Sequence, residues 1–315
     1  MARKKTAVVT GGSGFIGSWV CERLLQDGFG VICVDNISSG NRRNIAHLRD
    51  NENFEFMEQD VREPMNIRAR VDTVFHLSSR ASPVDFVEHA VEILMTNSTG
   101  TRNSLELARK NKARFLLASS SEVYGNPLEH PQRETYWGNV NPNGVRSSYD
   151  ESKRFSEALT SAYVRNHGLD ARIARIFNTY GPRMRKDDGR VIPNFTSQAL
   201  SGRPITVYGD GSHSRAFCYV EDLVDGLVRL AFKGGLKGEV VNVGNPREVK
   251  VLEVAKLVKK ITGTKSEIVF KPLPKDDPVR RRPDISKARR LLKWEPKVPL
   301  EAGLQKTIEY FKKFS

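Results

Sequence analysis

A tyrosine and a lysine four residues apart, Tyr149 and Lys153, give the clearest sign of chemistry in the sequence. On a helix this spacing places both side chains on one face. A nearby ammonium group lowers the pKa of a phenol, so that the phenol can act as a general base near neutral pH. The lysine can also hold the ribose of a cofactor. The pair therefore predicts removal of a proton from a hydroxyl group.

A hydroxyl partner for this tyrosine should lie at the end of the preceding strand. The run from Ala118 to Gly125 contains three consecutive serines followed by Glu122. We expect Ser120 to be the partner of the tyrosine and Glu122 to face the same site. A serine at this place could also serve only to cap the end of the strand.

Three glycines indicate a cofactor site. Gly11, Gly14 and Gly17 follow the first apolar strand and open the first helical pattern. The first permits a tight turn, the second lets the backbone approach a pyrophosphate, and the third lets helix and strand pack closely. The phosphates then meet the helix N-terminus. We expect a dinucleotide here, with Phe15 and Ile16 beside the glycines.

An acidic residue indicates which dinucleotide binds. Asp35 ends the second strand, 18 residues after the last glycine. A carboxylate there can accept hydrogen bonds from both adenosine ribose hydroxyls, and it would repel the 2′-phosphate of NADP. We therefore expect NAD as the cofactor. The remaining residues expected at this site are Asn36, Asp60, Val61 and Leu77.

These residues need a sheet to position them, and the first half of the chain predicts one. Short apolar strands are expected at Thr6–Thr10, Val31–Asp35, Phe54–Asp60, Thr73–Leu77, Phe115–Ser119 and Ala171–Ile176. Helical patterns separate them, which indicates a parallel sheet covered on both faces. The fold class is therefore α/β, a doubly wound parallel (Rossmann) sheet whose ligands bind beyond the carboxyl ends of the strands.

The pattern changes after Asn178, where glycine, proline, arginine and aspartate become frequent. Later helices are expected near 193–200, after Glu221, and at 251–262, 285–292 and 300–314, with strands at 240–243 and 267–270. We predict an NAD-binding domain over residues 1–177, to which about 215–243 returns. Residues 178–214 and 244–315 should form a smaller, interleaved lobe that binds the substrate.

The composition argues against several classes of protein. No run approaches the roughly 20 apolar residues of a membrane span, and glycines follow the basic N-terminus too closely for a signal peptide. We expect a cytoplasmic protein. The three cysteines are scattered, so neither a disulfide nor a metal site is expected. The net charge of +14 is dispersed. It suits a polyanionic small ligand, and we expect neither a nucleic-acid nor a membrane partner.

Along nearly its whole length, the sequence resembles the extended short-chain dehydrogenase/reductase superfamily, and most of all the UDP-glucuronic acid decarboxylases, or UDP-xylose synthases. The matching blocks are 119–125, 136–142, 149–154, 175–184, 188–191, 276–278 and 282–284. The resemblance implies that tightly bound NAD oxidises C4 of UDP-glucuronate, C6 leaves as carbon dioxide, and C4 is reduced again to give UDP-xylose. It also implies a homodimer through a four-helix bundle, formed by the helix of Tyr149 and a helix near 97–111.

The pair Ser121 and Glu122 separates this reading from its alternatives. In sugar-nucleotide 4,6-dehydratases the pair is Asp-Glu, and the aspartate protonates the departing hydroxyl, for which a serine is a poor acid. In many UDP-sugar 4-epimerases the glutamate position is not acidic. An epimerase acting on UDP-galactose or UDP-glucuronate remains the main alternative. A nucleotide- or RNA-binding regulatory protein would not need the intact Ser120, Tyr149 and Lys153.

The resemblance also suggests substrate contacts. Arg215 matches an arginine that such decarboxylases keep near the substrate, and either Glu122 or a water is a candidate to protonate C5. Arg80 stands where the family has a hydrophobic or prolyl residue, and it could approach an anionic group or face solvent. The further candidates are Asn178, Arg190, Val191, Asn194, Tyr208, Arg281 and Arg282. Which arginine of the run 280–282 points inward is left open.

Overall fold

The computed structural model describes residues 3–273 and 280–314, and seven of its strands form one parallel sheet. Their order is β11-β6-β5-β4-β1-β2-β3. The bounds are β1 Thr6–Thr10, β2 Gly30–Asp35, β3 Phe54–Glu58, β4 Thr73–His76, β5 Arg114–Ser120, β6 Ala171–Ile176 and β11 Val240–Val243. The strand order reverses beside β1, which opens a crevice at the carboxyl ends of the strands.

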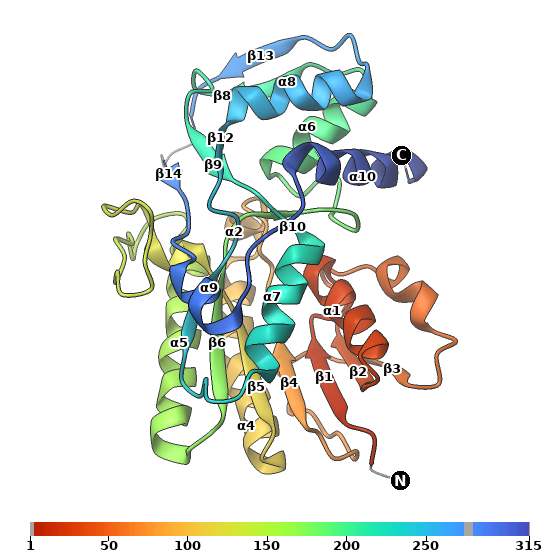
Figure 1. Cartoon of the computed structure of the whole chain (residues 1–315), viewed down its shortest axis with the longest axis vertical. Coiled ribbons are helices and arrows are strands. Elements are labelled where there is room, and N and C mark those ends of the chain that lie inside the picture. The colour runs from red at the N-terminus through yellow and green to blue at the C-terminus, as the bar shows by residue number, and fades with distance from the viewer. Residues whose placement is uncertain (1–2, 274–279, 315) are drawn as a thin grey trace.

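Helices cover both faces of this sheet (Figure 1). Consecutive strand residues point to opposite faces, so Ala7 and Val9 of β1 belong to one core and Val8 to another. The first core contains α1 (Phe15–Gln26) and α7 (Val220–Phe232), and the second contains α4 (Thr101–Asn111) with α5 (Ser147–His167) packed beside it. The predicted doubly wound α/β fold class is confirmed.

A smaller lobe lies above the carboxyl ends of the strands, at the top of Figure 1. Its helices are α6 (Val191–Leu200), α8 (Val251–Thr262) and α10 (Leu300–Lys313). Strand β8 (Ile205–Tyr208) pairs with β13 (Ile268–Lys271), and β9 (Ser214–Ala216) lies between β12 (Glu248–Lys250) and β14 (Arg280–Arg281). The other short elements are α2 Asp85–Glu88, α3 Ala90–Met95, β7 Thr179–Tyr180, β10 Cys218–Tyr219 and α9 Ser286–Leu292.

The expected elements are present, with shifted ends. The third strand stops at Glu58, two residues before the predicted end. The helix expected at 97–111 is preceded by α3 and a π-helical turn, Thr96–Gly100. A Cβ at Gly100 would lie 2.7 Å from Cγ2 of Val61, so glycine allows this turn to pack closely against the segment that follows β3. The two- and three-residue strands were not predicted, because they are too short to show alternation.

Residues 240–243 return to the main sheet, where β11 pairs with β6. The division into two domains itself stays a prediction. The sequence block Asp276 to Pro278, one of the blocks that carry the family resemblance, lies outside the described residues. Within 3–273 and 280–314, none of the helices combines the length and the apolar character that a membrane crossing requires.

Candidate active site

A cavity of about 700 Å³ is lined by residues of the main sheet's carboxyl end and of the smaller lobe. Every predicted site residue except Arg282 lines it. From the cofactor set these are Gly11, Gly14, Phe15, Ile16, Gly17, Asp35, Asn36, Asp60, Val61 and Leu77. From the catalytic and substrate sets they are Arg80, Ser120, Glu122, Tyr149, Lys153, Asn178, Arg190, Val191, Asn194, Tyr208, Arg215 and Arg281.

Arg282 is not brought together with the others. Its backbone N–H donates to Oε1 of Gln132 at 2.9 Å, and its guanidinium lies 3.4 Å from the carboxylate of Glu248. Among the three clustered arginines, only Arg281 lines the cavity. Arg281 pairs with Arg215 in the parallel register of β14 and β9, and this pairing turns alternate residues to opposite sides.

The glycine-rich loop fits a phosphate-bearing ligand. Gly11 has a φ of 69°, and a Cβ at Gly17 would lie only 2.0 Å from the oxygen of Gly11. Gly14 caps α1 without a side-chain hydrogen bond, which leaves the first N–H groups of the helix for a ligand. These N–H donors match the diphosphate of a dinucleotide.

Asp35 is held at the edge of this cradle. Its carboxylate accepts hydrogen bonds from the N–H groups of Ser13 (3.0 Å) and Ile37 (2.8 Å). A Cβ at Gly40 would lie 3.1 Å from both carboxylate oxygens, so the glycine keeps the space beside Asp35 open. Both oxygens keep lone pairs that ribose hydroxyls could use. This geometry suits the role predicted for Asp35.

Asp60 is less available than the sequence suggests. It accepts hydrogen bonds from Arg62 and, at 2.9 Å, from the amide of Asn36. The hydrogen bond from Arg62 is the main reason why the pKa of Asp60 is lowered. Asp60 therefore fixes the loops after β2 and β3, and its neighbour Val61 lies against Gly100.

Tyr149 and Lys153 lie one turn apart on α5, and both are buried, with 5% and 3% of their surfaces exposed. The lysine Nζ lies 5.7 Å from the centroid of the tyrosine ring and donates to the carbonyl of Ala118 at 3.0 Å. The ring of Phe86 stacks on Tyr149 at 4.7 Å. Stacking on Phe86 therefore helps to fix the orientation of the tyrosine ring.

Burial changes the pKa of both groups, and for the tyrosine it acts against the predicted effect of the ammonium. Burial raises the pKa of Tyr149 to about 12, although a hydrogen bond with Ser120 lowers it. Burial lowers the pKa of Lys153 to about 8, opposed by the charge of Glu157. Ser120 also accepts a hydrogen bond from the N–H of Glu122, so it both caps the following turn and contacts the tyrosine.

Glu122 is held by two arginines. Arg281 donates to its Oε1 at 2.9 Å, and Arg146 donates to its Oε2 at 2.6 Å. Burial alone would raise the pKa of this carboxyl, but the charges of Arg281 and Arg146 outweigh it and lower the pKa to about 2. The charge of Arg215 acts in the same direction. At neutral pH, Glu122 is thus a carboxylate that accepts hydrogen bonds and has no proton to give.

The segment 185–194 brings further polar groups to the cavity. Arg190 pairs with Asp188 at 2.7 Å, and its charge lowers the pKa of Tyr149 against the larger effect of burial. The amide of Asn194 donates to the carbonyl of Gly189 at 2.9 Å, so this side chain supports the loop. Arg190 is therefore the member of this segment whose charge acts on Tyr149.

Among the lining residues that reasoning from the sequence missed are Arg146, Phe86 and Arg183. Arg146 stands three residues before Tyr149, and this helical spacing could have identified it. Phe86 comes from the short helix α2, which no sequence period indicates. Arg183 lies 4.2 Å from the ring of Trp19 and pairs with Glu22, a contact between segments far apart in the chain.

Residues 8–307 match the family described as GDP-mannose 4,6 dehydratase. UDP-glucuronic acid decarboxylase 1 of Danio rerio is 51% identical over 308 residues, which cover 98% of this chain and 73% of that protein. UDP-glucuronic acid decarboxylase 4 of Arabidopsis thaliana is 52% identical over 308 residues, which cover 97% of this chain and 68% of that protein.

Solved structures of epimerases have the same fold at lower identity. UDP-glucose 4-epimerase of Thermotoga maritima, with UDP-glucose, has a TM-score of 0.90 and 35% identity and covers 98% of this chain and 99% of its own. UDP-glucuronic acid 4-epimerase of Bacillus cereus, in complex with UDP-glucuronic acid and NAD, has a TM-score of 0.89 and 29% identity and covers 98% and 100%. About half of the residues, in contrast, are shared with the decarboxylases. The chain therefore belongs to the GDP-mannose 4,6 dehydratase family, and within it to the UDP-glucuronic acid decarboxylases.

Proposed function

We propose that this chain converts UDP-glucuronate to UDP-xylose and carbon dioxide, with NAD retained through the reaction. The observation that carries the proposal is the position of Glu122, a carboxylate fixed between two arginines in the cavity that Tyr149 also lines. A dehydratase would need an acid at residue 121, where this chain has Ser121. The relatives that share half of its residues are decarboxylases.

The cofactor proposal rests on the glycine cradle and on Asp35. Gly11, Gly14 and Gly17 would hold the diphosphate, and Asp35 would accept hydrogen bonds from the adenosine ribose. When bound, NAD supplies a hydride acceptor that takes a hydride from C4 of the sugar and later returns it. Lys153, buried beside Tyr149, would hold the second ribose.

Tyr149 is the proposed base for the 4-hydroxyl proton. The side chain of Ser120 lowers the pKa of Tyr149 and so favours the phenolate that proton removal requires. The positive charge of Arg190 acts in the same direction. Together these groups oppose the effect of burial, which by itself disfavours the phenolate.

Oxidation at C4 makes loss of carbon dioxide straightforward. The ketone is then β to the C6 carboxylate, so the C5–C6 electron pair passes into an enolate as carbon dioxide leaves. Arg190 and Arg215 line the cavity and would stabilise the negative charge of this enolate. The reaction then needs one proton at C5.

The charge state of Glu122 favours one of the two candidates for that proton. A carboxyl group whose pKa is about 2 is ionised at neutral pH. We therefore propose that Glu122 holds a water molecule by accepting its hydrogen bond, and that this water protonates C5. A proton from solvent converts the hydroxide that remains back to water, so the overall reaction consumes one proton. Arg281 and Arg146 keep the carboxylate in place for this role.

We further propose a homodimer through α5, as predicted, in which α2 and α3, which precede the predicted helix 97–111, supply part of the buried face. Apolar side chains of α2, α3 and α5 face solvent in the single chain: Val87, Val91, Leu94, Met95 and Phe155. Val91 is 74% exposed, and α3 packs beside α5. A second copy would cover this surface. A cytoplasmic location stays a prediction from the sequence.

The test is to incubate the purified protein with UDP-glucuronate and catalytic NAD, and to follow carbon dioxide and the nucleotide products. Carbon dioxide together with UDP-xylose is the expected result. Conversion to UDP-galacturonate without carbon dioxide, or interconversion of UDP-glucose and UDP-galactose, would assign the chain to the epimerases. Glu122 would then lose its proposed role.

A further inference from the structure

Arg80 lies in the loop that follows β4, beside the cofactor cradle. A Cβ at Gly11 would lie 2.8 Å from the backbone nitrogen of Ser78, so this loop packs directly against the glycine-rich turn. The reaction proposed above gives Arg80 no part. Its side chain is nevertheless largely buried, with 13% of its surface exposed, so the desolvation of its charge has to be compensated by fixed partners.

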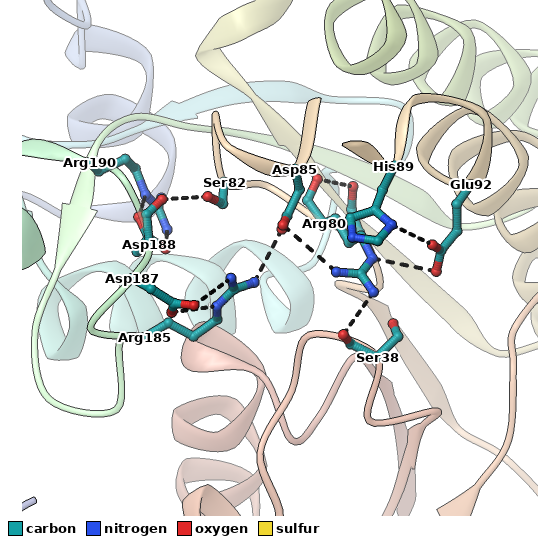
Figure 2. A network of polar contacts seen from close by, with 11 residues as sticks. Ser38, Arg80, Ser82, Asp85, His89, Glu92, Arg185, Asp187, Asp188 and Arg190 are labelled. Atoms are coloured by element: carbon teal, nitrogen blue, oxygen red, sulfur yellow. Dashed lines mark hydrogen bonds and ion pairs between the residues drawn. The ribbon is translucent and has the colours of Figure 1, made fainter. Parts of the chain in front are cut away.

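The guanidinium of Arg80 reaches across to the loop that follows β2 (Figure 2). Its Nη2 donates to the carbonyl oxygen of Ser38 at 2.8 Å. Two carboxylates balance its charge: Asp85 at 3.8 Å and Glu92 at 3.4 Å. Arg80 thus joins α2 and α3 to the turn that begins immediately after Asp35.

That turn is strained. Ile37 has a φ of 57°, in the left-handed region that a β-branched residue rarely occupies. Such a conformation persists only when its surroundings determine it. Within the turn, Ile37 N–H donates to Oδ1 of Asp35 at 2.8 Å, and Ser38 N–H donates to Oδ1 of Asn36 at 3.1 Å. Two hydrogen bonds anchor the turn to other parts of the fold: the amide of Asn36 donates to Asp60 at 2.9 Å, and Arg80 donates to the carbonyl of Ser38 at the other end of the turn.

Asp85, one of the two carboxylates that face Arg80, is itself held by the segment 185–188. Asp85 pairs with Arg185 at 3.2 Å, and Arg185 pairs with Asp187 at 3.1 Å. The hydroxyl of Ser82 donates to the carbonyl of Asp188 (Figure 2). Arg80 is therefore held by a segment that is itself tied to the smaller lobe. A contact anchored in this way can hold a strained turn.

We propose that Arg80 is a positioning residue for the cofactor, which acts by holding the strained turn Asn36–Ser38 in the conformation that binds the adenosine ribose. The inference rests on the proposed use of NAD. Asn36 and Ser38 line the cavity next to Asp35, so a change in this turn moves the groups that meet the ribose. The residues predicted to contact the substrate, such as Asn178 and Arg215, come from other segments of the cavity lining, so we expect UDP binding not to depend on the turn.

The chemistry of arginine suits this task better than that of lysine. A guanidinium has several donors in a planar fork, so it can bind the carbonyl of Ser38 and face two carboxylates together. The single ammonium of a lysine cannot make all these contacts at once. Arg80→Lys should therefore restore only part of what Arg80→Ala loses.

The experiment measures dissociation constants of NAD and of UDP by calorimetry. Arg80→Ala should weaken NAD binding about tenfold, the size expected for one charge-assisted hydrogen bond, and leave UDP binding within about twofold. The matched control is Arg109→Ala, which removes an arginine from an exposed ion pair with Glu106 on α4 and should leave both constants unchanged.

A second variant tests the strain directly. Ile37→Gly removes the steric cost of the positive φ, so the turn no longer needs to be held. In the Ile37→Gly background, Arg80→Ala should weaken NAD binding by less than about threefold. If Arg80→Ala folds poorly, Arg80→Lys in both backgrounds gives the same comparison, with a smaller loss of NAD binding.

Three outcomes would overturn the proposal. The first is an unchanged dissociation constant of NAD in Arg80→Ala, and the second is an equal loss of UDP affinity in that variant. The third is a tenfold loss of NAD affinity from Arg80→Ala in the Ile37→Gly background as well. An equal loss of UDP binding would make Arg80 a substrate contact. A wild-type protein that binds UDP and no NAD would overturn the proposed cofactor as well, and the two failures are thereby distinguished.

Discussion

Arg281 and Glu122 meet across 159 residues of the chain, with Nη1 at 2.9 Å from Oε1 and Nη2 at 3.3 Å from Oε2. The arginine side chain is only 2% exposed, whereas Arg146, the second partner of the carboxylate, is more accessible to solvent. The three charged groups are therefore not equally dependent on one another. The buried Arg281 relies on the carboxylate of Glu122, whereas Glu122 is paired with two arginines, Arg281 and Arg146.

We therefore expect the loss of Glu122 and the loss of Arg281 to lower the free energy of unfolding by different amounts. Glu122→Met leaves the buried charge of Arg281 without a carboxylate and should lower the free energy of unfolding by about 3–5 kcal/mol. Arg281→Met should cost less, because Glu122 keeps Arg146. Urea denaturation of both variants at neutral pH measures the difference, and the double variant should regain part of the loss. Equal losses in the single variants would contradict the argument.

Removal of the proposed base should stop the reaction and leave the fold intact. Tyr149→Phe keeps the ring that stacks on Phe86 and deletes the hydroxyl that accepts the proton. We expect carbon dioxide release to fall about 10²–10⁴-fold, the usual contribution of general base catalysis. NAD binding and the melting temperature are the controls. Carbon dioxide release at the wild-type rate would assign the proton to another group.

The main sheet was predictable because its strands carry their own signal. Runs such as Thr6–Thr10 are apolar on both faces, since both faces are covered by helices, and polar turns bound them. Gly11, Gly17, Tyr149 and Lys153 could likewise be selected from the sequence, because a single turn or a single helix fixes the spacing within each pair. The family resemblance was likewise confirmed by the decarboxylase relatives.

Properties that depend on distant segments were not predictable. Which arginine of the run 280–282 faces the cavity is decided by the pairing of β14 with β9, and two-residue strands have no period. The pKa of Tyr149 depends on how completely the surrounding lobes bury it, which the spacing to Lys153 does not reveal. The partners of Arg80 come from three segments that only the fold brings together.

The close contact between the glycines predicts loss of the cofactor in Gly17→Ala. A Cβ there would lie 2.0 Å from the oxygen of Gly11 and 2.8 Å from Cα of Gly12. Both are backbone atoms, so the loop itself has to move, and each hydrogen bond to a charged phosphate that is lost costs about 1.5–3 kcal/mol. We expect NAD affinity to fall about a hundredfold in calorimetry.

The matched control for this variant is Gly234→Ala. Among the described residues, no atom lies within 4 Å of a Cβ at this position, and its φ is not positive. NAD affinity should stay at the wild-type value. UDP binding to Gly17→Ala should also persist, since the smaller lobe is unchanged. Loss of both ligands would indicate general unfolding instead of a local change in the cradle.

Lys153 makes stability depend on pH in a direction that can be worked out. Burial lowers its pKa from 10.5 to about 8 in the folded chain. Between these values the unfolded chain binds more protons than the folded one, so the free energy of unfolding rises as the pH rises through this window. Below pH 8 the buried ammonium costs about 3 kcal/mol, because each pKa unit corresponds to about 1.4 kcal/mol.

Lys153→Met should therefore be inactive and yet more stable than the wild type. At pH 7 the variant escapes the cost of the buried ammonium but loses the hydrogen bond to the carbonyl of Ala118, so we expect a net gain of about 2 kcal/mol. The gain should shrink as the pH rises from 8 toward 10.5, because the wild-type lysine is then neutral. Urea denaturation of both proteins across this range measures it. A variant that is less stable than the wild type at pH 7, or a difference that does not change with pH, would show that the lysine is not buried as a destabilised cation.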